Sequence, residues 1–141
     1  MTSFTDTVDI DRPAEVVFDV YARVEDWPAW TASIRQVRRL DPGPLAVGSR
    51  TEVRQPRLPV AAWTVTELVP GQVFSWESTA PGLRSVGRHR VHPRPGGCTA
   101  VAEIEHSGPL APLLVLLTRR LTSRYLRLEC DGLRRRCEEE G

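Results

Sequence analysis

Strand-like segments fill the middle of this chain and one long helical segment follows them, and this order limits the folds open to it. Six segments carry the alternation and the β-branched and aromatic residues typical of strands: 34–40, 48–55, 61–69, 72–80, 84–92 and 98–106. Pro-Gly, Gly-Pro and Gly-Gly pairs separate most of them. Residues 111–140 instead place Leu114, Leu117, Leu121 and Leu128 on one stripe of a helix. The order predicts an antiparallel sheet covered on one face by a long helix.

The first part of the chain adds a strand and two short helices. Residues 3–11 are rich in threonine and valine, which favours a strand. Asp11 can then cap a helix, Pro13 suits its first turn, and valines at helical spacing extend the pattern to Val24. Residues 25–33 form a second short helix or turn. The complete prediction is an α+β fold in which a curved, seven-stranded antiparallel sheet wraps around the long C-terminal helix.

Two tryptophans, Trp27 and Trp30, surround Pro28 in the second short helix. A spacing of three puts both rings on roughly the same side. We interpret them as closing one end of the curved sheet, with contact to a ligand as the alternative.

Length, charge and hydropathy bound the function. A chain of 141 residues suits one domain, 1–141. Its 19 basic and 18 acidic residues give a formal charge of +1, which provides no net attraction to nucleic acid. The longest apolar run, 109–117, is far shorter than the ~18–20 residues of a membrane span, and no secretion leader is recognisable. We expect neither a nucleic-acid partner nor a membrane span.

The three cysteines, Cys98, Cys130 and Cys137, form no CxxC pair, which argues against a disulfide framework and against a zinc site. Strand alternation separates His106 from the neighbouring glutamates, so no other metal site is expected. A cytoplasmic location is the simplest expectation.

Four stretches carry a resemblance to a known family: VDIDRPAEVVFDVYARVEDWPAW near the start, VGSRTEV, WTVTELVPGQVFSWES, and RRLTSRYLRLECDGLRRRCE in the last helix. Together they span nearly the whole chain. The sequence resembles the START-like or helix-grip (SRPBCC) superfamily, in particular its polyketide cyclase/dehydrase branch. That resemblance implies a cavity between sheet and helix that holds a hydrophobic or aromatic small molecule.

Strand alternation predicts which side chains face such a cavity. Arginines should point to water, so the residues that alternate with them point inward. The expected lining also includes the alanine face of the last strand and the leucine stripe of the helix. It comprises Thr51, Val53, Trp63, Val65, Phe74, Trp76, Ser78, Val91, Ala102, Ile104, Leu114, Leu117 and Leu121. Apolar and aromatic groups with a few polar ones are usual in small-molecule sites.

Three residues are the candidate catalytic groups. His89 lies in mid-strand on the inner face, where it can act as a general base or hydrogen-bond an enol or carbonyl oxygen. Tyr125 can donate its phenol to a ligand oxygen, and Arg124 can pair with a carboxylate or a polarised carbonyl. Each has a structural alternative: a satisfied core histidine, a packed tyrosine and a solvated arginine.

Three functions therefore remain open from the sequence. The first is cofactor-independent cyclisation or dehydration of a polyketide-like intermediate, largely by holding a flexible chain in one conformer. The alternative is a non-catalytic lipid or metabolite carrier of the same fold, and a protein-binding co-activator is a third. The apolar start of the last helix, 108–117, can form the mouth of the cavity, a homodimer contact or a membrane-surface patch, and the lack of a basic face argues against the last.

Overall fold

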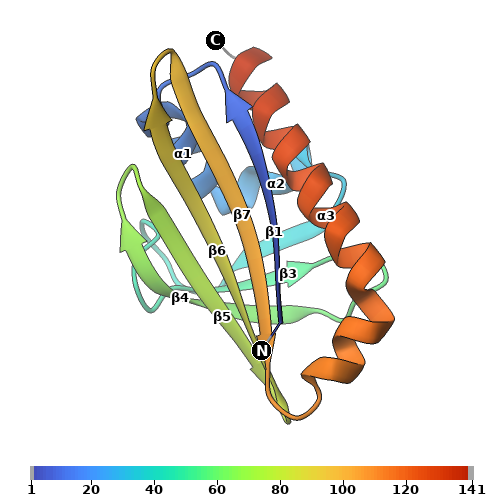
Figure 1. Cartoon of the computed structure of the whole chain (residues 1–141). Helices are drawn as coiled ribbons and strands as arrows, with labels where there is room; N and C mark the ends of the chain where they lie inside the picture. The colour runs from blue at the N-terminus through green and yellow to red at the C-terminus, as the bar shows by residue number, and fades with distance from the viewer. Residues whose placement is uncertain (1, 140–141) are drawn as a thin grey trace.

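A computed structural model describes residues 2–139 and shows a seven-stranded antiparallel sheet with one long helix along it (Figure 1). The strand order is β1-β7-β6-β5-β4-β3-β2. The strands are β1 (Thr2–Ile10), β2 (Gln36–Arg39), β3 (Arg50–Arg54), β4 (Ala61–Val69), β5 (Val73–Ala80), β6 (Leu83–Arg94) and β7 (Gly97–Ser107). The helices are α1 (Ala14–Ala22), the 3-10 turn η1 (Val24–Asp26), α2 (Trp27–Trp30) and α3 (Ala111–Glu139). The predicted fold is confirmed.

The long helix α3 begins where the sequence predicted and continues through Gly132. The last residue of the predicted helix, Glu140, lies outside the described residues. A glycine is required in this helix because a Cβ at Gly132 would lie 1.9 Å from the carbonyl oxygen of Trp30. Helix α2 therefore packs directly against the backbone of α3.

Helix α1 starts later than its predicted cap. Its N-cap residue is Pro13, which provides no side-chain hydrogen bond, so the prediction that Asp11 caps it was wrong. Asp11 instead donates its backbone N–H to a carboxylate oxygen of Glu138 at 3.1 Å. This contact ties the start of α1 to the end of α3, and Figure 1 shows α1 and α2 near that end of the long helix.

An aromatic cluster fills the space between α1, α2 and the middle strands. Trp27 is only 2% exposed, and its indole N–H donates to the carbonyl oxygen of Tyr21 at 2.9 Å. The ring of Tyr21 lies 5.8 Å from those of Trp27 and Phe74. Trp30 is buried beside them. Trp27 also packs against Trp76 of β5 and His89 of β6, with ring centroids 5.4 and 5.3 Å apart.

Strand β4 departs from regular pairing with β5. Its register shifts between Val65 and Glu67. Such a bulge bends a strand and increases its local twist.

No helix within residues 2–139 is long and apolar enough to cross a membrane.

Candidate functional site

A cavity of about 380 Å³ lies between the sheet and α3. Most of its wall is apolar and aromatic, including three tryptophans, and a smaller number of hydroxyl, imidazole and carboxyl groups interrupts it. The wall includes Trp27, Val53, Leu58, Trp63, Trp76, Ile104, Leu114 and Leu126, with the polar residues Ser33, Gln55, Ser78, Ser85, His89, His106, Thr118, Thr122, Tyr125 and Glu129. Among the described residues no arginine lines it, although all 19 basic residues of the chain are arginines.

The predicted lining residues fall into three groups. Six of them lie on the cavity wall: Val53, Trp63, Trp76, Ser78, Ile104 and Leu114. Five are buried in the protein and do not reach the wall: Thr51, Val65, Phe74, Val91 and Ala102. Strand alternation predicts which face of the sheet a side chain lies on, but not whether the side chain reaches the cavity or is covered by another element. Phe74, for example, packs edge-on against Phe18 of α1, with ring centroids 6.3 Å apart.

The third group comprises Leu117 and Leu121, which do not line the cavity. Leu117 is 72% exposed, so its prediction as a lining residue was wrong. The face of α3 that lines the cavity carries residues three or four positions apart, with Tyr125 and Leu126 adjacent. It comprises Leu114, Thr118, Thr122, Tyr125, Leu126 and Glu129. The leucine stripe used for the prediction is displaced around the helix from this face.

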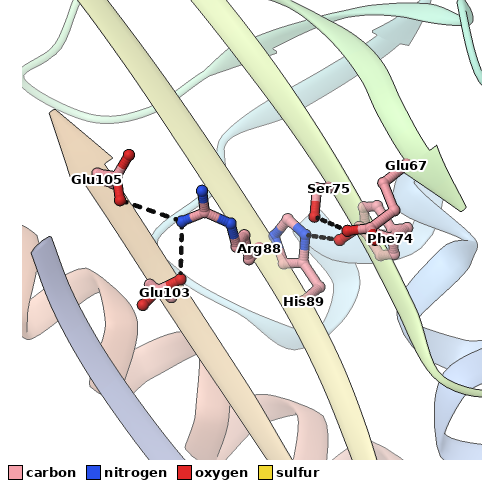
Figure 2. Close-up of polar contacts among 7 residues, drawn as sticks. All are labelled: Glu67, Phe74, Ser75, Arg88, His89, Glu103 and Glu105. Atoms are coloured by element: carbon pink, nitrogen blue, oxygen red, sulfur yellow. Dashed lines mark hydrogen bonds and ion pairs between the residues drawn. The ribbon is translucent and has the colours of Figure 1, made fainter. Parts of the chain in front are cut away.

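His89 is held as a neutral acceptor on the inner face. Figure 2 shows neighbouring residues of β6 on opposite faces: Arg88 points to Glu103 and Glu105, and His89 points to Phe74. The Nδ1 atom of His89 lies 3.2 Å from the carbonyl oxygen of Phe74. Because a carbonyl only accepts, Nδ1 carries the proton, and neutral His89 keeps a lone pair on Nε2.

The surroundings of His89 disfavour its charged form. The ring is 5% exposed and stacks on the Phe74 ring at a centroid distance of 4.2 Å. Burial lowers the pKa of His89 from 6.5 to about 3, against a smaller opposing effect of the Phe74 carbonyl. An imidazole with that pKa is a weak base at neutral pH, so its geometry suits hydrogen bonding better than proton abstraction.

Of the other two candidate catalytic residues, Tyr125 lines the same cavity as His89 and Arg124 does not. Tyr125 lines the cavity, but its phenol donates to the carbonyl oxygen of Pro56 and so joins the β3–β4 loop to α3. Arg124 is exposed and does not line the cavity. Helical spacing explains the difference, since consecutive residues of a helix point about 100° apart.

Glu129 is one of several polar residues of the wall that the sequence prediction missed, together with Ser33, Gln55, His106, Thr118 and Thr122. Its side chain accepts a hydrogen bond from the Tyr21 phenol, with 2.6 Å between Tyr21 Oη and Glu129 Oε2. The residue is only 8% exposed. Loss of water raises the pKa of Glu129 from 4.5 to about 7, against a smaller lowering effect of the Tyr21 hydrogen bond. Its position seven residues after Thr122, on the same helical face, is the sequence signal that could have found it.

Two further polar features lie along the wall. Ser85 Oγ and His106 Nδ1 form a hydrogen bond of 2.8 Å, and burial lowers the pKa of His106. A Cβ built on Gly87 would lie 2.9 Å from Nε1 of Trp76. The missing side chain at Gly87 therefore makes room for the Trp76 ring.

A curved antiparallel sheet that wraps around one long helix over a mostly apolar cavity defines a START-like, helix-grip protein. The sequence matches the family described as "Polyketide cyclase / dehydrase and lipid transport" over residues 1–138. The chain therefore belongs to this family. No curated protein sequence matches it.

Solved structures with this fold include a START superfamily protein from Mycobacterium smegmatis, 16% identical over 99% of this chain and 99% of that chain, with a TM-score of 0.76. The di-domain ARO/CYC StfQ from the steffimycin biosynthetic pathway is 13% identical over 98% of this chain and 51% of its own, with a TM-score of 0.77. The Zhui aromatase/cyclase from Streptomyces sp. R1128 is 16% identical over 96% of this chain and 94% of its own, with a TM-score of 0.68. Identities this low establish the fold alone.

Proposed function

We propose that this protein binds a hydrophobic or aromatic small molecule in the cavity and promotes its cyclisation or dehydration, with a polyketide-like intermediate as substrate. The observation that carries the proposal is the cavity of about 380 Å³ with a mostly apolar wall that includes three tryptophans. Apolar walls with few, fixed polar groups are the usual makeup of small-molecule sites. Membership of the family and the shared fold with two aromatase/cyclase proteins support it.

Holding a flexible substrate in one folded conformer is the main catalytic effect available to such a cavity. Bringing two reacting atoms of one chain together removes much of the entropic barrier to ring closure. The tryptophan rings can stack on a flat ring of the substrate. They lie close together on the wall: the ring centroids of Trp63 and Trp76 are 5.7 Å apart, with 32° between the ring planes, and those of Trp27 and Trp76 are 5.4 Å apart. The lone pair on Nε2 of His89 can then orient a hydroxyl group of the substrate.

A non-catalytic carrier is the second candidate function. It is favoured by one observation: two of the three predicted catalytic groups are poorly suited to proton transfer. The Tyr125 phenol donates to Pro56, and the pKa of His89, lowered to about 3, makes the imidazole a weak base. A carrier would bind the same ligands and release them unchanged.

Ligand binding by the cavity can be tested with naphthaleneethanol, an uncharged flat probe, by calorimetry and tryptophan fluorescence. We expect one molecule to bind per chain. Ser78→Phe, which places a ring in the cavity, should weaken binding at least tenfold, whereas Ser123→Phe on the exposed face of α3 should not. Equal affinity in both variants, or no binding, would refute the proposal. Mass spectrometry of molecules that co-purify with the protein, with turnover assays on them, separates enzyme from carrier.

We further propose a cytoplasmic location and a homodimer. Cys98 and Cys130 are buried and form no disulfide bond, as expected of a protein from a reducing compartment. Leu113, Leu116 and Leu117 expose more than half of their surface at the start of α3 and can form the dimer contact. Sedimentation velocity over a range of concentrations tests the dimer, and Leu116→Glu should abolish it.

A further inference from the structure

We propose that the cavity selects ligands by charge and takes an aromatic amine, whose ammonium group binds the carboxylate of Glu129. This inference rests on the proposed small-molecule binding and names the ligand class. It follows from the charges of the wall, the environment of one carboxyl group and the rings beside it.

The wall offers no partner to an anionic ligand. No arginine lines the cavity within residues 2–139, and the chain contains no lysine. Burying a carboxylate or phosphate there would leave it without a counter-ion, which is strongly unfavourable. The basic side chains of this protein instead lie elsewhere, as Arg88 does in its ion pairs with Glu103 and Glu105 (Figure 2).

Glu129, in contrast, is a buried acidic residue that has no positively charged partner in the described part of the chain. One oxygen, Oε2, accepts the Tyr21 phenol at 2.6 Å, and the other, Oε1, has no hydrogen-bond partner in the described part of the chain. The side chain lies on the cavity wall and is more than nine-tenths buried. An ammonium group at Oε1 would supply both the missing hydrogen bond and the missing charge.

The Tyr21 ring, whose phenol binds Glu129, connects this carboxylate to the aromatic part of the cavity wall. The Tyr21 ring packs against Trp27 at 5.8 Å, and Trp27 packs against Trp76 at 5.4 Å. Both indoles line the cavity. The faces of tryptophan rings attract ammonium groups within about 6 Å, most strongly where water is excluded. The same rings can stack on the aromatic part of the ligand.

The titratable groups around Glu129 do not compete with a cation. Tyr21 from α1 and Cys130 from α3 both have a pKa raised mainly by burial, so they stay neutral. His89 from β6, whose ring lies 5.0 Å from that of Tyr21, stays neutral because its pKa is lowered to about 3. The other acidic residue along the wall, Glu103, pairs with Arg88 at 2.9 Å. Glu129 is therefore the acid left for the ligand.

Three probes with one ring system and different charges test this selection: naphthaleneethylamine, naphthaleneethanol and naphthaleneacetate. We expect the amine to bind at least tenfold more tightly than the alcohol, and the acetate to bind most weakly. Calorimetry should show the affinity for the amine rising with pH towards the pKa of Glu129, about 7, levelling off above it, and falling again only near about pH 10, where an alkylamine loses its proton. The affinity for the alcohol should not rise.

Glu129→Gln provides the matched variant, since glutamine keeps the size and an acceptor for Tyr21 but cannot ionise. It should remove the preference for the amine and its pH dependence and still bind the alcohol. Alcohol binding without a preference for the amine, or an amine preference that survives in Glu129→Gln, would overturn this inference and leave the proposed function intact. Failure of all three probes to bind would refute both.

Discussion

Replacing Glu129 by glutamine should stabilise the folded protein at alkaline pH and leave it unchanged in acid. The carboxyl group is buried on the cavity wall, and its pKa is raised from 4.5 to about 7. Each tenfold change in proton affinity corresponds to about 1.4 kcal/mol. The ionised form of Glu129 therefore costs the folded state about 3 kcal/mol relative to the unfolded chain.

The direction of the pH effect follows from which state holds the proton. Between about pH 4.5 and pH 7, the folded protein keeps the Glu129 proton and the unfolded chain releases it. The free energy of unfolding contributed by this group thus falls as pH rises through that window and is constant above it. Glutamine does not ionise, so the Glu129→Gln variant does not lose this free energy of unfolding as pH rises. Its amide oxygen still accepts the hydrogen bond from the Tyr21 phenol.

Urea unfolding of both proteins at a series of pH values measures the effect. We expect the two to agree within about 0.5 kcal/mol below about pH 4.5 and the variant to be about 3 kcal/mol more stable above about pH 8. His89 titrates in both proteins, so its contribution cancels in the difference. Glu139→Gln, an exposed position on the same helix, is the control and should show no such pH dependence. A difference that does not vary with pH would refute the reasoning.

Two further substitutions test the packing of α3, and a third tests whether Arg124 contributes to ligand binding. Gly132→Ala normally favours a helix, but here the new Cβ would lie 1.9 Å from the Trp30 carbonyl oxygen, so we expect a loss of about 1–3 kcal/mol in urea unfolding; a gain would contradict the close packing of α2. Tyr125→Phe removes the hydrogen bond to Pro56 and should cost about 1 kcal/mol, with faster hydrogen exchange in the β3–β4 loop measured by mass spectrometry. Exchange equal to that of the wild type would show that the bond does not restrain the loop. Arg124→Ala should leave calorimetric affinity for naphthaleneethanol within twofold, because its side chain is outside the cavity, and a larger loss would restore it as a site residue.

The strands were predictable because a half-buried strand alternates and because turns select glycine and proline. Alternation also identified the inward face correctly in β6, where Arg88 points out and His89 points in. It does not distinguish a side chain that faces a cavity from one covered by another element. Phe74 shares the inner face with Trp76, but α1 packs over Phe74 and the cavity lies against Trp76.

Helix α3 shows why the candidate site was harder to predict. A leucine stripe is the ordinary signal of a buried helical face, yet Leu117 lies exposed. The face towards the cavity carries Thr118, Thr122 and Glu129 instead. A cavity wall tolerates polar groups that a packed core does not, so hydrophobicity alone selects the wrong face. The tertiary contact that holds Glu129, from Tyr21 of α1, cannot be found from the helix alone.

The order of strands in the sheet has a consequence for synthesis of the protein. Within the described residues, β1 pairs with β7 and with no other strand, whereas β2 to β6 pair with strands adjacent in sequence. At about 5–20 residues per second, the ribosome delivers β7 roughly 5–20 s after β1. The first strand therefore waits, unpaired, while the middle of the sheet can already form. Because α3 follows β7, the cavity closes last, and a ligand can stabilise only the completed chain.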